Sequence, residues 1–257
     1  MPQDVTLVCM QDSDIPASQA TRVGKIRIRV LLAFTFAAGI SDALAWLGLG
    51  HLFVANMSGN VIIIGMGLGK AEDVNLAGAA TAVAAFIVGG LVHGFATRNE
   101  PAGWGRQTTW TFGLVASVLL ALSIVTLIWP PGKHTNLAWV VMAVMAFAMG
   151  AQGNAANRLS VAYVNTVAVT AAIFGISSAL FLAPETPQDK RTGAWREVPE
   201  PFVRAVLSVV ALAMGATTGA LLNHYAAFGV GLLVAAVVTG IGLTVGHLRV
   251  EERTDQS

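Results

Sequence analysis

The sequence predicts an all-α membrane protein, a polytopic bundle of transmembrane helices with an internal duplication. Hydrophobic residues make up 55% of the chain and charged residues 11%, against about 25% charged residues in ordinary soluble domains. Apolar runs recur at the length of about 20 residues that a helix needs to cross the hydrocarbon. Asp42 is the one acidic residue inside these long runs, and the charges left elsewhere are too few to cover a water-soluble fold.

Six runs reach the length of a membrane span. The first follows a polar tail that lacks the short apolar core of a cleavable signal, so we expect it to be retained as a helix. The tryptophans Trp104, Trp110, Trp129 and Trp139 lie at or near run ends, as amphipathic rings do at the membrane interface. The six runs cover residues 30–50, 74–97, 107–129, 136–157, 203–225 and 226–247.

Two further apolar stretches are predicted to be short or broken helices. Asn56 to Gly69 is shorter than a span, and Tyr163 to Ala183 is long enough but begins with polar residues. Each is either a full crossing or a re-entrant element that returns to the side it came from. The choice between six and eight spans is therefore open at this point.

The basic residues predict the orientation. If both short stretches return, every Lys and Arg except Lys70 and Lys133 lies on the side of the termini. If both stretches cross the membrane, Lys70 and Lys133 lie on the side of the termini, and Arg98, Arg106 and Arg158 lie on the opposite side. Both termini are predicted to be cytoplasmic in either case.

The chain divides into tails and two repeats. Shifting the sequence by 112 residues places Asp42 on Asn154 and Ser58 on Thr170, and a Gly-x-x-x-Gly pair follows each short stretch, at Gly90 and at Gly215. The order of long, broken, long and long helices thus repeats, as in secondary transporters, and three spans per half would invert the second half. The predicted parts are a cytoplasmic tail 1–29, a first transmembrane repeat 30–129, a second repeat 135–248 with a cytoplasmic loop 184–202, and a cytoplasmic tail 249–257.

Asp42 is the first candidate functional residue. It lies about twelve residues into the first run, close to mid-membrane, where an ionised carboxylate costs about 2.5–3.5 kcal/mol even on the gentlest scale. Two interpretations stay open. Asp42 binds a coupling proton, a cation or a polar substrate, or it joins helices through Ser41 or Asn56.

Polar residues also open both short stretches. In the first, Asn56 or Ser58 is predicted to cap a helix whose exposed amides would bind an anion or a polar group. Capping alone is the alternative for the first stretch, and hydrogen bonding between helices, worth about 0.6 kcal/mol per bond, is the alternative for the second. The predicted substrate or ion site comprises Asp42, Asn56, Ser58, Asn60, Gln152, Asn154, Thr166 and Thr170.

The segments Gly39–Ala43, Phe53–Asn60, Met149–Gln152 and Asn165–Thr170 together resemble the YoaK family, a domain of unknown function (number 1275) of bacterial multi-pass membrane proteins. The chain departs from the family pattern in its second half. It has Gly153 inserted in a Gln-Asn-Ala motif, and Ala171 where the family has a glycine. The resemblance implies a bacterial inner-membrane location and leaves the substrate open.

The function predicted is transport of a small solute or an ion. The rival hypothesis is a non-transporting structural or regulatory membrane protein whose polar residues serve packing alone, and a shared water-accessible cavity would discriminate between the two. Membrane lipid is an expected partner, and a homo-oligomer is left open. Nucleic acid is not expected, because no basic stripe is present.

No enzyme activity, cofactor or metal is expected. The sequence has no phosphate-binding loop, zinc motif or Gly-x-Ser-x-Gly elbow. The lone Cys9 lies in the polar tail, so it cannot form an intramolecular disulfide or a cysteine metal cluster.

Overall fold

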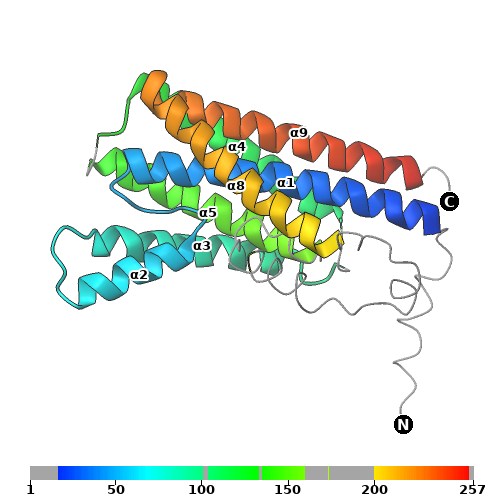
Figure 1. The fold of residues 1–257 in the computed structure, drawn as a ribbon, viewed down its shortest axis with the longest axis horizontal. Coiled ribbons are helices and arrows are strands. Elements are labelled where there is room, and N and C mark those ends of the chain that lie inside the picture. The colour runs from blue at the N-terminus through cyan, green and yellow to red at the C-terminus, as the bar shows by residue number, and fades with distance from the viewer. Residues whose placement is uncertain (1–16, 101–103, 133–134, 160–172, 174–199, 255–257) are drawn as a thin grey trace, which may run out of the picture.

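The computed structural model describes residues 17–100, 104–132, 135–159, 173 and 200–254, and the regular elements in these ranges are helices (Figure 1). The first half contains α1 (Ala17–Gly48), α2 (Met57–Leu68), α3 (Leu76–Ala96) and α4 (Arg106–Ile128). The second half contains α5 (Asn136–Arg158), α8 (Glu200–Tyr225) and α9 (Phe228–Thr254). The chain is therefore an all-helical, polytopic bundle, as the sequence predicts.

Six of these helices are long and apolar enough to cross a membrane, which confirms the six predicted runs. The first short stretch forms α2, a helix of 12 residues, which is too short to span. The second short stretch, Tyr163 to Ala183, lies outside the described residues except for Ile173, and so do Thr166 and Thr170.

Most of the basic residues that the structure describes lie at one end of the bundle. Figure 1 shows that α1, α4 and α8 begin at this end, and that α3, α5 and α9 finish there. We call it the basic end, because the helix ends that meet there carry Arg27, Arg98, Arg106, Arg158 and Arg204. Lys70 lies in the loop between α2 and α3, at the opposite end.

The first short stretch is re-entrant. Gly50 and His51 have φ angles of 98° and 59° and turn the chain at the end of α1. The following residues run back beside α1, and α2 then points toward the end at which α1 finishes (Figure 1). Both ends of this stretch thus lie on the same side, in agreement with a six-span topology for the first half.

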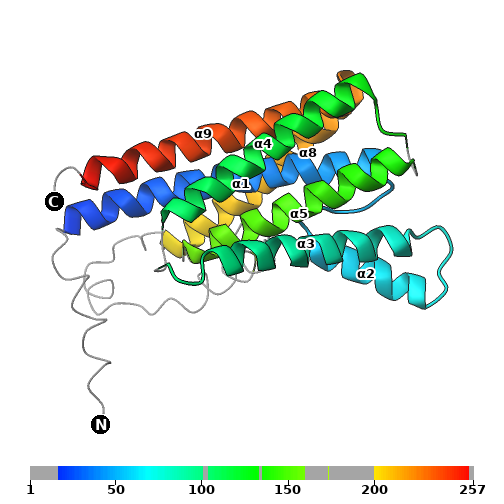
Figure 2. The ribbon, with the colours of Figure 1, turned by 180° about the vertical axis from the view of Figure 1, so that it is seen from behind.

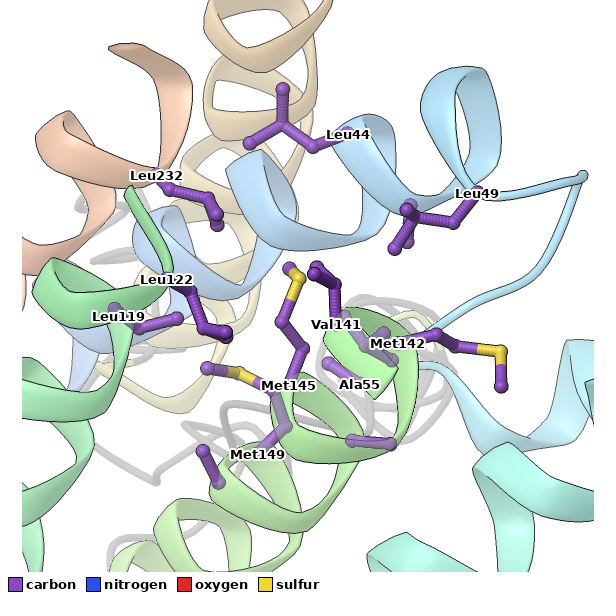
Figure 3. Close-up of a cluster of buried hydrophobic side chains, with 14 of the residues drawn as sticks. Leu44, Leu49, Ala55, Leu119, Leu122, Val141, Met142, Met145, Met149 and Leu232 are labelled. Atoms are coloured by element: carbon purple, nitrogen blue, oxygen red, sulfur yellow. The ribbon is translucent and has the colours of Figure 1, made fainter. Parts of the chain in front are cut away.

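A hydrophobic core joins helices of both halves. Figure 3 shows Leu44 of α1, Leu119 of α4, Met145 of α5 and Leu232 of α9 converging, and all four are buried. The flexible thioether of a methionine fills the irregular space left where several helices meet. The core therefore lies between the repeats and belongs to neither one alone.

Two close helix crossings connect the halves. A Cβ added at Gly39 or Gly215 would collide with the carbonyl oxygen of Leu212 or Phe36 respectively, so α1 and α8 touch backbone to backbone. Gly219, one turn beyond Gly215, meets Ile40, one turn beyond Phe36, so the two helices are parallel. Only a residue without a side chain fits at such a contact.

The crossing of α3 and α5 is built in the same way. A Cβ at Gly89 would collide with the carbonyl oxygen of Phe147, and a Cβ at Gly150 with that of Phe86. In both crossings, each helix offers a carbonyl three residues before its glycine. Because α1 opens the first half and α5 opens the second, these matching contacts make α1 the counterpart of α5 and α3 the counterpart of α8.

This correspondence corrects the register of the duplication by one residue. Phe36 and Gly39 correspond to Phe147 and Gly150, an offset of 111 residues instead of the 112 expected from the sequence. The counterpart of Asp42 is then Gly153, and Asn154 corresponds to Ala43. One residue turns a helix position by about 100°, so Asp42 and Asn154 occupy different faces of their helices.

The remaining helix contacts follow the same correspondence between the two halves. The helix α1 packs on α9 as α5 packs on α4, and α4 packs on α9. Figure 2 shows α4 and α9 side by side. Ser123 and Gly229 touch near one end of this pair, and Gly113 and Leu243 near the other, so α4 and α9 are antiparallel, as counterparts in inverted repeats must be.

The crossing glycines can be tested by substitution. We expect Gly150→Ala to lower the melting temperature of the purified protein in detergent, because overpacking at a backbone contact costs about 1–3 kcal/mol. Gly240→Ala is the matched control. No atom lies within 4 Å of a Cβ at Gly240, and replacing an open helical glycine by alanine stabilises by about 0.5–1 kcal/mol. Equal effects of the two substitutions would contradict the crossing.

Candidate functional site

Asp42 binds the backbone of the re-entrant segment. Its Oδ1 accepts hydrogen bonds from the backbone N–H groups of Val54 and Ala55, at 2.8 and 2.7 Å. The N–H of Asn56 is 3.0 Å from Oδ2 and 3.4 Å from Oδ1. Asp42 is itself buried, so one carboxylate satisfies three consecutive backbone donors away from water.

These bonds also fix the depth of the segment. Asp42 lies six residues before the end of α1, or about 9 Å along the helix axis. It is closer to the end of the span than the mid-membrane position expected from the sequence, because the apolar part of α1 begins at Ile26. Residues 54–56 return to this level before α2 begins.

Asn60 holds the same segment from α2. Its Oδ1 accepts from the N–H of Phe53 at 3.0 Å, and its Nδ2 donates to the carbonyl of Phe53 at 2.7 Å. The Phe53 ring lies against Gly59, where a Cβ would come within 2.6 Å of it, and stacks on Trp46 with the ring centroids 4.9 Å apart. The fully buried Asn60 amide thus pairs with both polar backbone groups of one residue.

Asn56 and Ser58 bond to each other. Ser58 Oγ donates to Asn56 Oδ1 at 2.7 Å. Asn56 occupies the N-cap position of α2, which confirms one of the two predicted caps, although its side chain makes no capping hydrogen bond. The backbone N–H of Asn56 is bonded instead to Asp42, a residue of another helix.

The structure therefore brings together the four predicted site residues of the first half. Asp42, Asn56, Ser58 and Asn60 hold one re-entrant segment, and their hydrogen bonds join them to that segment or to each other. Phe53 and Gly59, which were not predicted as site residues, belong to the same arrangement. Their signal in the sequence was their position within the Phe53–Asn60 motif.

Gln152 lies apart from this cluster, where α5 faces α1. It is 1% exposed. Its Nε2 donates to the carbonyl oxygen of Phe34 at 3.5 Å, the long limit of a hydrogen bond. Its Oε1 is buried without a hydrogen-bond partner, which is unusual enough for a buried polar atom to need an explanation.

His93 of α3 has a second buried atom of this kind. Its Nδ1 is 2.8 Å from Thr111 Oγ1, and the Thr111 hydroxyl donates to the carbonyl of Gln107. The hydroxyl hydrogen is thereby used, so Nδ1 carries the proton and Nε2 is left as an acceptor, by assignment from this network. Nε2 is buried and has no partner.

Asn154 lines a groove between α3 and α5. The groove has a volume of about 660 Å³, and its lining is mostly apolar. The first-half cluster does not contribute to the lining of this groove. Within the described ranges, no three metal-ligating side chains come together.

The comparisons with known proteins agree with this architecture. The family model described as protein of unknown function (DUF1275) matches residues 30–245, and the chain therefore belongs to this family. The chain is also 28% identical over 145 residues to the UPF0700 transmembrane protein YoaK of Bacillus subtilis (strain 168). The match covers 56% of the chain and 63% of that relative. No solved structure matches.

The role of Asp42 can be tested by Asp42→Asn. We expect this variant to lose about 1–3 kcal/mol of stability, measured as a lower melting temperature, because hydrogen bonds to charged groups are worth about 1.5–3 kcal/mol. Both carboxylate oxygens accept N–H groups, and an asparagine would turn its own NH₂ toward one of these donors. The exposed Ser58 provides the control, since Ser58→Ala should stay within about 0.5 kcal/mol of the wild type. Equal stability of wild type and Asp42→Asn would refute the anchoring role.

Proposed function

We propose that this member of the DUF1275 family is a secondary transporter of a small solute or an ion, built from two inverted three-span repeats. The observation that carries the proposal is the matched pair of glycine crossings, in which α1 with α8 and α5 with α3 use the same contacts. Inverted repeats give a membrane protein two related packings, which alternating access to a site between them requires.

The buried polar atom of Gln152 supports a site where the two repeats meet. Gln152 lies where α5 meets α1, and these two helices are counterparts, so their contact lies on the axis that relates the halves. Transporters with inverted repeats bind their substrate at the interface between the repeats. We therefore assign Gln152 as the central binding residue of the proposed transporter.

The chemistry of buried polar atoms suggests the kind of substrate. Gln152 Oε1 and His93 Nε2 are both acceptors without a protein partner. An acceptor buried in this way is satisfied by a cation or by a solute with N–H or O–H groups. Catalysis is not part of the proposal.

One observation favours the rival function, a non-transporting structural or regulatory protein. The first-half cluster around Asp42 is already bonded within the protein, as packing residues would be. We therefore leave Asp42, Asn56, Ser58 and Asn60 out of the proposed binding site and assign them to holding the re-entrant segment.

Cysteine accessibility tests alternating access. In a Cys9→Ser background, we expect a cysteine at Ser41 or at Gln152 to react with a membrane-impermeant maleimide added from either side of sealed vesicles. Ser41 is the counterpart of Gln152 at the offset of 111 residues, and both are buried. Their labelling requires that the interface between the repeats opens in turn to each side.

Two exposed positions serve as controls for the side from which the reagent reaches the protein. Lys70→Cys and Arg106→Cys, at opposite ends of the bundle, should each react from one side only. Labelling of the two buried cysteines from neither side, or from one side alone, would overturn alternating access and favour the structural function.

We further propose that the basic end faces the cytoplasm of a bacterial inner membrane, because Lys and Arg are retained on the cytoplasmic side. A reporter fused after Leu248 should be active only in a cytoplasmic form, and one inserted at Lys70 only in a periplasmic form. The opposite pattern of activities would reverse the orientation.

A further inference from the structure

The groove between α3 and α5 results from the way these helices diverge. At Gly89 and Gly150 the two backbones touch, whereas a Cβ at Gly90 or Gly94 would have its nearest atom at 3.6 or 3.7 Å. The helices thus separate beyond the crossing, and small residues keep the space between them open. The groove holds about 660 Å³, which is within the usual range for ligand sites.

The groove lies open along an apolar face of α3. Leu91 and Phe95 take part in its lining and are 66% and 68% exposed. Because α3 is long and apolar enough to span a membrane, these side chains face hydrocarbon, and lipid has access to the groove from the side.

The length of the groove matches one leaflet. Its lining on α3 extends from Phe86 to Arg98, or about 18 Å at 1.5 Å per residue. Half of a hydrocarbon core of about 30 Å is about 15 Å. The groove therefore extends from the crossing to the basic end over about the depth of a single lipid tail.

Polar groups lie toward the basic end only. The Arg98 guanidinium lies over the Phe95 ring, 4.4 Å from its centroid, at the mouth of the groove. The Asn154 amide nitrogen lies deeper, 3.7 Å from the Cβ position of Gly94. The groove thus combines an apolar length, an amide donor and a terminal cation, in that order.

We propose that this groove binds one anionic phospholipid from the leaflet at the basic end. One acyl chain lies along Gly90 and Gly94, the Asn154 amide donates to an ester carbonyl, and Arg98 pairs with the phosphate. A basic residue beside an intramembrane groove selects anionic head groups in this way. The site does not depend on the proposed transport activity.

Native mass spectrometry of the full-length protein tests the site. The protein is exchanged into mixed micelles that contain equal amounts of phosphatidylglycerol and phosphatidylcholine, and the lipids retained are counted. We expect the wild type to retain phosphatidylglycerol in preference to phosphatidylcholine. Arg98→Gln should reduce this preference about fivefold, because one interfacial basic residue contributes about 1 kcal/mol. Arg106→Gln removes a charge at the same end outside the groove lining and should leave the preference unchanged.

A second pair of variants tests the apolar part. Gly94→Leu fills the groove and should reduce retention of both lipids, whereas Gly240→Leu adds the same side chain where a Cβ meets no atom and should have no effect. Equal preference in wild type, Arg98→Gln and Arg106→Gln would overturn the head-group assignment. Unchanged lipid retention in a folded Gly94→Leu variant would show that something other than lipid fills the groove and would also refute the proposal.

Discussion

The backbone contacts at four glycines hold this bundle together. In lipid, two apolar helices gain little from burying their side chains against each other, so their association depends on close van der Waals packing. Gly39 and Gly215 allow that approach for α1 and α8, and Gly89 and Gly150 allow it for α3 and α5. Each crossing takes one helix from each half. Neither half can therefore complete its own packing, and the two must assemble together.

The second constraint is the free-energy cost of unpaired backbone N–H and C=O groups inside a membrane. The chain between α1 and α2 is not helical, so its N–H and C=O groups need partners other than their own neighbours. Asp42 supplies acceptors for three donors, and Asn60 pairs with both polar groups of Phe53. The residues that most resemble a ligand site in the sequence are thus used to fold the chain back on itself.

The sequence predicted the six spans and the shortness of α2, because hydrophobic length alone determines both. It indicated Asn56 as one alternative partner of Asp42, and the structure contains that contact, but it did not predict the bonds from Val54 and Ala55. An acid and the backbone it binds are separated by a turn whose shape depends on Gly50 and His51, and no periodic pattern encodes that return. The sequence also aligned Asp42 with Asn154 and not with Gly153. Asp42 and Asn154 are similar polar residues, each followed by alanine, and the sequence offers only side chains for comparison. The contacts at Gly39 and Gly150 show that the backbones correspond one residue earlier.

The strength of the crossings limits how the protein can move. Because α1 touches α8 and α3 touches α5 backbone to backbone, each pair is expected to move as a unit, and a change between two states would separate one pair from the other. Gln152 bonds to Phe34 across this boundary at 3.5 Å, a weak contact beside the bonds of 2.7 to 3.0 Å that hold the re-entrant segment. A substrate that takes the place of this bond and also satisfies Gln152 Oε1 would interact differently with the two arrangements of the pairs. Such a difference in binding energy is what allows a ligand to shift a conformational equilibrium.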